Sequence, residues 1–85
     1  MYSIRLKKSA AKELQRLPGF AIHKISRALD GLEKDPRPAG AKKLEGISGS
    51  LWRIRVGDYR IIYQIDDGIK VIEVKRIGNR KDVYR

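Results

Sequence analysis

Three arginines in the second half of the chain, Arg53, Arg55 and Arg60, have a spacing that could bind an anion. They lie in two segments in which apolar and polar residues alternate with a period of two, as in β-strands that have one buried face. If Gly57-Asp58 forms a two-residue hairpin turn, Arg55 lies directly opposite Arg60 on the neighbouring strand. Like charges in opposing positions destabilise a sheet, so the pair points to an anion bound over it.

A third strand extends the same argument. Residues 69–77 also alternate, and Asp67-Gly68 predicts a second two-residue turn. In this register Arg60 faces Lys75, so three cations form one row across three strands. One alternative is that these are solvated charges that protect an exposed sheet. Another is a register slip of one residue, which would replace Lys75 by Arg76 in the row and keep the row basic.

The two faces of the predicted sheet differ in composition. The face expected to pack on helices carries apolar residues: Trp52, Ile54, Val56, Tyr59, Ile61, Tyr63, Ile72 and Val74. The other face carries most of the charges: Arg53, Arg55, Arg60, Ile62, Gln64, Val71, Glu73 and Lys75. An antiparallel sheet can leave one face in water, so the second face is where a ligand is expected.

The first half of the chain predicts the elements that cover the apolar face. Residues 2–6 alternate as a short strand, and Ser9 stands where the N-cap of a first helix is expected. Pro18-Gly19 ends that helix, and a second helix follows up to the prolines at 36 and 38. The connector 36–50 is expected to be mobile and to expose Lys42 and Lys43.

These elements predict one α+β domain over residues 1–85, in the order β-α-α-β-β-β. An antiparallel meander sheet is expected to carry a helical hairpin on one face.

Charge and composition restrict the function further. The 85 residues contain 20 Lys and Arg against 10 Asp and Glu, a formal net charge of +10. This favours a polyanionic partner, namely nucleic acid, an anionic membrane surface or an acidic protein, over a basic surface without a specific partner. The chain has no cysteine, and a single His23 cannot build a metal site, so neither a metal nor a cofactor is expected. No signal peptide or membrane-spanning run is present, so a cytoplasmic location is expected.

The end of the chain adds two candidate residues. After Gly78 the sequence presents Arg80 and, near the terminus, Tyr84. A phenol beside a group of cations can stack on a nucleobase or exchange a proton. The alternative is that Tyr84 simply packs on the sheet as a half-buried aromatic.

The chain resembles the RelE/ParE toxin superfamily over nearly its whole length. The motifs that carry the resemblance are Lys43-Leu44-Glu45-Gly46, Leu51-Trp52-Arg53-Ile54-Arg55-Val56, Gly57-Asp58-Tyr59-Arg60-Ile61-Ile62-Tyr63, Ile77-Gly78-Asn79-Arg80 and Val83-Tyr84. Each motif alone is weak, and their combination is fairly specific.

The resemblance implies a function. RelE-like toxins cut messenger RNA in the ribosomal A site without a metal, by attack of a ribose 2′-hydroxyl on the adjacent phosphorus. It assigns catalytic roles to Arg55, Arg60, Arg80 and Tyr84, with Arg60 and Arg80 at the phosphate. The residues expected to bind RNA are Arg53, Lys42, Lys43, Lys75 and Lys81.

One departure from the family pattern leaves the general base open. Some relatives carry lysines where this chain has Arg53 and Arg55. Arginine does not deprotonate in proteins, whereas a crowded lysine can become neutral. Tyr84 and a neutral Lys75 are the two candidates for the base.

The resemblance also implies partners and rival functions. The expected partners are an acidic antitoxin that covers the basic surface of a monomeric toxin, and mRNA on the ribosome, with contacts to 16S rRNA of the 30S subunit. The rivals are a ParE-like toxin that poisons DNA gyrase, an RNA-binding module without catalysis, and a relative that has lost its activity.

Overall fold

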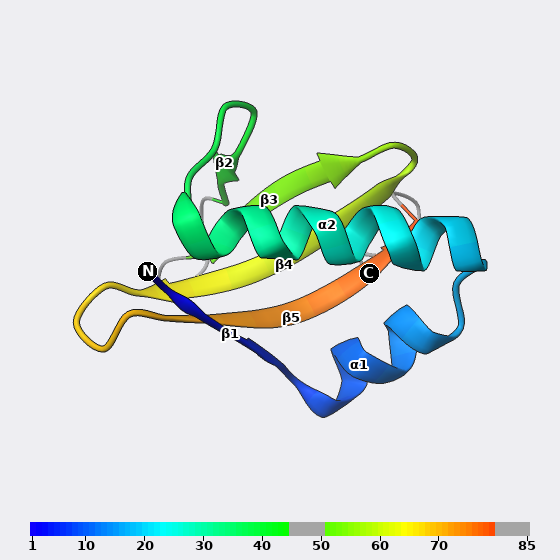
Figure 1. Cartoon of the computed structure of the whole chain (residues 1–85), viewed down its shortest axis with the longest axis horizontal. Coiled ribbons are helices and arrows are strands. Elements are labelled where there is room, and N and C mark those ends of the chain that lie inside the picture. Colours follow the sequence, from blue (N-terminus) through cyan, green and yellow to red (C-terminus); the bar gives the residue numbers. More distant parts are fainter. Residues whose placement is uncertain (45–50, 80–85) are drawn as a thin grey trace.

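The computed structural model describes residues 1–44 and 51–79 (Figure 1). Its elements are β1 (Ser3–Leu6), α1 (Lys8–Gln15), α2 (Gly19–Lys34), β2 (Lys42–Lys43), β3 (Leu51–Val56), β4 (Tyr59–Asp66) and β5 (Val71–Asn79). The strands form one sheet in the order β1-β5-β4-β3-β2. The predicted α+β class and order of elements are confirmed, and β2 is an additional short strand.

The sheet is mixed. Strands β3, β4 and β5 form the predicted antiparallel meander. Strand β1 pairs in parallel with β5, with Ile4 opposite Ile72 and Leu6 opposite Val74. A parallel pair requires a long crossover connection, and the crossover here contains both helices. The two-residue strand β2 pairs antiparallel with β3 at the other edge.

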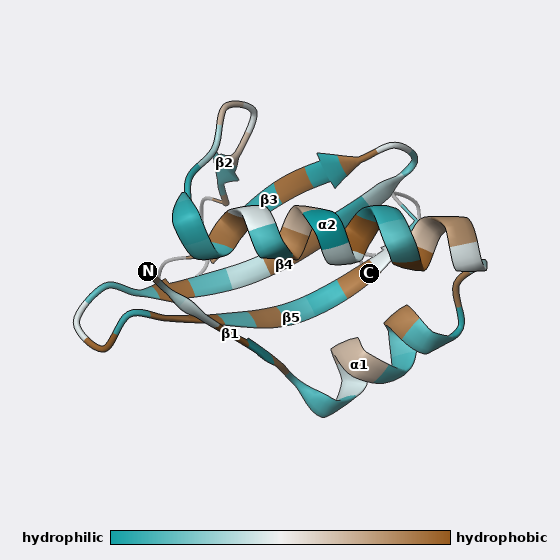
Figure 2. Cartoon of the chain, in the orientation of Figure 1, coloured by the Kyte–Doolittle hydropathy of each residue, from teal (hydrophilic) through white to brown (hydrophobic). Residues whose placement is uncertain are grey.

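The core lies between α2 and one face of the sheet. Helix α2 runs across this face, with its apolar residues at Ala21, Ile25, Leu29 and Leu32 all buried (Figures 1 and 2). The sheet contributes the residues predicted to face the helices, and Ile54, Ile61, Tyr63, Ile72 and Val74 are all buried there. Helix α1 contacts β5 and adds Ala10 to the core. Neither helix in the described ranges is long and apolar enough to cross a membrane.

The prediction that Ser9 caps the first helix is wrong. Helix α1 begins two residues earlier than predicted, at Lys8, and its N-cap Lys7 makes no side-chain hydrogen bond to the helix. Helix α2 begins as predicted after the break, with Pro18 in the N-cap position. Pro18 has an extended backbone, with φ −59° and ψ 152°, which ends the preceding helical turn.

The predicted two-residue turn between the last two strands is also wrong. Four residues, 67–70, connect β4 to β5, so β5 begins at Val71 and not at residue 69. The longer turn is stabilised by Asp66, whose Oδ1 accepts hydrogen bonds from the backbone N–H of Gly68 at 3.0 Å and of Ile69 at 3.2 Å. Lys70 completes the turn in the left-handed region, with φ 58°.

A β-bulge in β5 changes the register a second time. Tyr63 lies opposite Val74 but Ile62 lies opposite Arg76, so Lys75 is the extra residue. The longer turn and the bulge together place Gly78, and not Lys75, opposite Arg60. The predicted pairing of Arg60 with Lys75 is therefore wrong.

Candidate functional site

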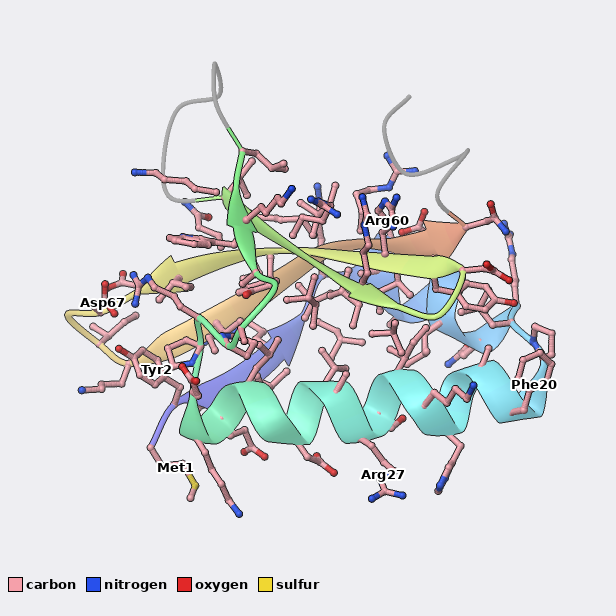
Figure 3. All side chains as sticks on the ribbon, turned by 90° about the horizontal axis from the view of Figure 1, so that it is seen from above. Met1, Tyr2, Phe20, Arg27, Arg60 and Asp67 are labelled. Atoms are coloured by element: carbon pink, nitrogen blue, oxygen red, sulfur yellow. The ribbon has the colours of Figure 1, made fainter. Side chains whose placement is uncertain are left out.

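The pair Arg55 and Arg60 forms the centre of the site. The predicted register between β3 and β4 is confirmed, and the two arginines are direct cross-strand partners. Arg60 projects from the side of the sheet that faces away from α2 (Figure 3). Its other neighbour in the sheet is Gly78, which has no side chain. Arg60 therefore has a like charge on one side and no side chain on the other.

Two further cations lie on the same face. Arg53 is two residues from Arg55 along β3, and Lys42 of β2 is the cross-strand partner of Arg53. We call Lys42, Arg53, Arg55 and Arg60 the cationic cluster. Lys43 was also predicted to bind RNA, but it pairs with Trp52 and so belongs to the opposite face, since successive residues of a strand alternate.

Two members of the cationic cluster are buried. Arg53 and Arg60 are each only 7% exposed, whereas Arg55 and Lys42 are exposed. In the described part of the chain, Arg53 Nη1 and Arg60 Nε are buried without a hydrogen-bond partner. A buried donor that is left without an acceptor costs about 1–3 kcal/mol of folding free energy, and more where the group is charged. An oxyanion over this face would supply the absent acceptors.

A pocket of about 270 Å³ opens beside the cationic cluster at the edge of β3. It is lined by Ala39, Gly40, Lys42, Arg53, Ile54 and Arg55. Gly40 has φ 92°, a conformation that residues with a side chain rarely adopt. The sequence identified the cations of this pocket but not the contribution of the connector that precedes β2.

The described part of that connector is held by specific contacts. The buried Tyr63 hydroxyl donates a hydrogen bond to the carbonyl oxygen of Pro36 at 2.7 Å. Arg37 Nη2 forms an ion pair with Asp67 Oδ2 at 2.9 Å, and the Arg37 guanidinium lies 5.2 Å from the ring centroid of Trp52. Hydrogen bonds from Arg37 and from Tyr2 lower the pKa of Asp67. Between Pro36 and Lys42 the connector therefore makes specific contacts with the sheet, next to the pocket.

Because of the bulge, β5 does not place Lys75 beside Arg60 as predicted. Lys75 forms an ion pair with Glu73 on its own strand, and this partner lowers the pKa of Glu73. The side chain of Lys75 is therefore engaged by Glu73 and is less available to a substrate than an unpaired cation would be. Arg76 lies opposite Ile62, so the slipped register, which would place Arg76 opposite Arg60, is also wrong. Arg76 Nε donates a hydrogen bond to Glu13 Oε2 of α1 at 3.1 Å, a contact that the sequence did not reveal.

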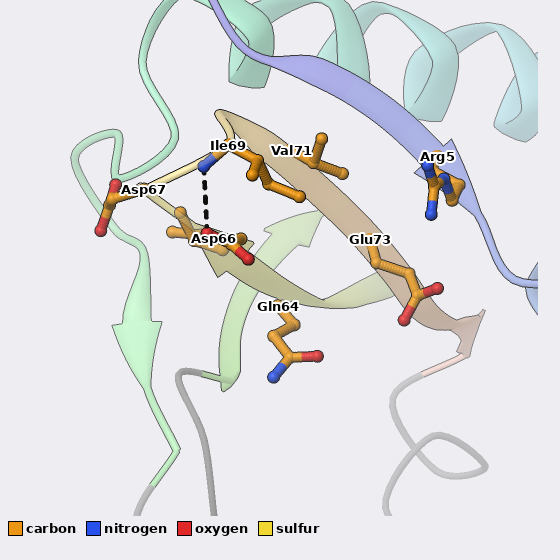
Figure 4. Close-up of a pocket in the computed structure, with 8 residues that line it drawn as sticks. Arg5, Gln64, Asp66, Asp67, Ile69, Val71 and Glu73 are labelled. Carbon is orange, nitrogen blue, oxygen red and sulfur yellow. Dashed lines mark hydrogen bonds between the residues drawn. The ribbon is translucent and has the colours of Figure 1, made fainter.

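The sheet face that carries the cationic cluster is acidic at its opposite end. A pocket of about 480 Å³ is lined by Arg5, Gln64, Ile65, Asp66, Asp67, Ile69, Val71 and Glu73 (Figure 4). Its carboxylates already have partners: Asp66 accepts from the turn backbone, Asp67 binds Arg37 and Glu73 binds Lys75. The face is therefore divided, and an anion is favoured only at the end that carries the cationic cluster.

The remaining predicted site residues, Arg80, Lys81 and Tyr84, lie outside the described residues. Within residues 1–44 and 51–79, no group of three or more His, Cys, Asp or Glu side chains is placed to hold a metal ion. His23 is exposed on α2.

Comparison with known proteins identifies the family. The family model described as "ParE toxin of type II toxin-antitoxin system, parDE" matches residues 4–84. The chain belongs to this toxin family. It is RelE-like: it is 34% identical to "Toxin RelE" of Mycobacterium tuberculosis over 99% of this chain and 87% of that protein. It is 28% identical to "Toxin RelG" of the same organism, over 99% and 97% of the two chains.

Solved structures of RelE toxins share the fold. The archaeal RelE–RelB complex from Pyrococcus horikoshii is 34% identical, with a TM-score of 0.83 over 96% of this chain and 98% of that chain. The intact E. coli RelBE toxin–antitoxin complex is 26% identical, with a TM-score of 0.80 over 93% and 96% of the two chains. This chain is therefore a RelE-like toxin of a type II toxin–antitoxin system.

Proposed function

We propose that this toxin is a metal-independent endoribonuclease that cleaves mRNA. The observation that carries the proposal is that buried Arg53 and Arg60, beside the exposed Arg55, each have one guanidinium nitrogen without a hydrogen-bond partner among the described residues. A fold gains no stability from three like charges on neighbouring strands. A phosphodiester is an anion whose oxygens match the bidentate geometry of guanidinium groups.

The proposed reaction is an attack of the ribose 2′-hydroxyl on the adjacent phosphorus. The O2′–P bond forms, the P–O5′ bond breaks, and a proton moves from the 2′-hydroxyl to a base while another reaches the departing 5′-oxygen. The pentavalent intermediate carries additional negative charge, which guanidinium groups at fixed positions stabilise as it forms. Arg60 and Arg80 are proposed at the phosphate, and Tyr84 in base stacking or proton transfer.

Arg55 is exposed and lies directly opposite Arg60 on the neighbouring strand. This position suits a second ligand of the phosphate. We propose that Arg55 contributes to catalysis and that Arg53, Lys42 and Lys81 bind the RNA. Lys75 is a weaker candidate because its ammonium is paired with Glu73. Lys43 is weaker because it lies on the other face of the sheet.

We further propose that cleavage occurs on the ribosome, in the A site, with contacts to 16S rRNA. Arg53 and Arg55 cannot serve as a general base. A site without a strong base depends on precise orientation of the attacking hydroxyl, which a bound ribosome can provide. An acidic antitoxin is the proposed protein partner, because similar RelE toxins form RelE–RelB complexes and this chain carries a net charge of +10.

The test is brief expression of the chain in bacteria, followed by mapping of transcript 5′ ends by primer extension. The matched control is the Arg80→Ala variant at the same expression level. New 5′ ends inside translated codons that depend on Arg80 support a ribosome-associated ribonuclease. Intact transcripts in arrested cells would contradict it.

A second candidate function is the poisoning of DNA gyrase. The observation that favours it is the family model, whose description names a ParE toxin. The same experiment separates the two functions, because a gyrase poison arrests growth without new transcript ends. If neither arrest nor cleavage occurs, the chain is an RNA-binding module or an inactive relative.

A further inference from the structure

Helix α1 carries a row of cations on its exposed side. Lys8, Lys12 and Arg16 follow one another at intervals of four residues, and all three are exposed. The opposite side of the helix packs on the core through Ala10 and Leu14. At a rise of 1.5 Å per residue the row is about 12 Å long. We call these three residues the α1 cation row.

The α1 cation row has no structural partner in the described part of the chain. None of its members forms an ion pair there. Glu13 is the acidic residue of this helix, and its carboxylate is turned to β5, where it accepts hydrogen bonds from Arg76 and from the Ile77 N–H. A lysine in the first turn of a helix is also unfavourable, since the helix dipole is positive there. Lys12 lies in the last turn, where the dipole favours a cation, so the dipole alone does not account for a row that spans the whole helix.

The position of α1 relates this row to the cationic cluster. Arg55, Arg60 and Gly78 are successive neighbours across β3, β4 and β5. On the outer edge of β5, the pairing with β1 ends at Val74. Beyond that point α1 lies against β5, held by the contact between Glu13 and Ile77 (Figure 1). Along the line from Arg55 through Arg60 to Gly78, α1 is therefore the next element beyond β5.

We propose that the α1 cation row is a second RNA-contact surface, which binds the phosphate backbone of the strand that leaves the cationic cluster. This inference rests on the proposed function for the identity of the substrate. Lysine is a flexible point charge that suits phosphate without reading bases, so the contact is independent of sequence. Its effect is to raise the affinity for RNA that extends beyond the site.

The experiment measures binding of 2′-O-methyl RNA, which lacks the attacking hydroxyl, as a function of salt concentration. It compares a long RNA of about 20 nucleotides with a short RNA of about four nucleotides. The short RNA reaches only the cationic cluster, since binding sites for single strands cover about 4–16 nucleotides. In the variant with Lys8→Gln, Lys12→Gln and Arg16→Gln, loss of three phosphate contacts lowers the salt slope by about 2 for the long RNA. Affinity for the long RNA falls at least about 10-fold, and affinity for the short RNA stays within about 2-fold.

The matched control changes three exposed cations of α2 in the same way: Lys24→Gln, Arg27→Gln and Lys34→Gln. Both variants lose the same charge, so a general field effect would weaken binding equally in both. Equal losses, or an unchanged salt slope in the α1 variant, would overturn the proposal. The proposal would also be overturned if the α1 variant lost affinity for an acidic antitoxin peptide and kept its affinity for RNA. Because the RNA cannot be cleaved, the outcome is separate from whether the toxin is a nuclease.

Discussion

The Glu13 carboxylate on α1 accepts a hydrogen bond from Arg76 Nε on β5 at 3.1 Å. Its second oxygen accepts the backbone N–H of Ile77, also at 3.1 Å. These contacts lie beyond the bulge, where β1 no longer pairs with β5. Glu13 thus replaces a neighbouring strand at this edge, and it fixes the part of β5 that places Gly78 opposite Arg60.

Substitution of Glu13 by Ala is expected to impair catalysis more than substrate binding. Without the carboxylate the end of β5 can shift against Arg60, so we expect kcat for RNA cleavage to fall about 10-fold, equivalent to about 1.4 kcal/mol of activation free energy. KM should change less than about 2-fold, since a misplaced group acts mainly on the transition state. The Glu13→Gln variant, whose amide oxygen can still accept the Ile77 N–H, should retain most of the activity.

The control for Glu13 is Glu33→Ala, which removes a half-buried carboxylate from α2 instead of α1. Activity is compared well below the melting temperature of each variant. A purely structural role for Glu13 would lower the melting temperature and leave kcat unchanged, which is the result that contradicts the prediction.

Replacement of Arg60 is expected to separate stability from function. Arg60→Ala should abolish cleavage and toxicity in a folded protein. Arg60→Met should do the same and also raise the free energy of unfolding, because a well-packed apolar residue in place of a buried charge stabilises by about 1–4 kcal/mol. Urea unfolding and a cleavage assay measure the two effects.

The exposed Arg27 on α2 is the control for this substitution, and Arg27→Met should change stability by less than about 0.5 kcal/mol. Full toxicity of Arg60→Ala would show that the phosphate does not bind at Arg60. A marked loss of stability in Arg60→Met would show that the guanidinium has a structural partner.

The role of Tyr84 is a prediction from the sequence that a single substitution can test. Tyr84→Phe keeps the aromatic ring and removes the hydroxyl. If the residue only stacks on a base, single-turnover cleavage rates stay within about 2-fold of the unmodified toxin. If the hydroxyl transfers a proton, the rate falls about 100-fold or more, the usual contribution of general acid–base catalysis.

The sequence predicted the central hairpin well because its signals are local. Alternation with a period of two assigned Ile54 and Ile61 to the core face, and the turn at Gly57, with φ 62°, set Arg55 opposite Arg60. The predictions that were wrong depend on side-chain hydrogen bonds and on contacts between distant parts of the chain. Two consecutive aspartates precede Gly68, and only the structure shows that Asp66 closes the longer turn.

The edge of the sheet was beyond local patterns, whereas the bulge left a trace in the sequence. Lys75 and Arg76 are consecutive polar residues between the buried Val74 and Ile77, so the alternation with a period of two breaks where Lys75 is the extra residue of β5. The parallel pairing of β1 with β5 joins segments almost 70 residues apart, as in Ser3 opposite Val71, and follows from packing of the whole chain. For the same reason the sequence could not show that Glu13 reaches Arg76.

The last prediction concerns Tyr63, which anchors the connector beside the pocket. Its hydroxyl donates to the Pro36 carbonyl oxygen, and burial raises the pKa of Tyr63 from 10.0 to about 12. The neutral phenol is therefore favoured in the folded state. Its stabilising contribution is complete below pH 10, the ordinary pKa, and is lost as the pH rises from 10 towards 12.

Comparison with Tyr63→Phe isolates this contribution, because all other groups titrate alike in the two proteins. At pH 7 the variant should be less stable by about 1 kcal/mol, since it loses one buried hydrogen bond. Between pH 10 and 12 the stability of the unmodified protein should fall relative to the variant by about 1.4 kcal/mol per pH unit. Urea unfolding of both proteins across this range measures the difference. A difference that stays constant with pH would mean that the Tyr63 hydroxyl ionises as readily in the folded protein as in the unfolded chain.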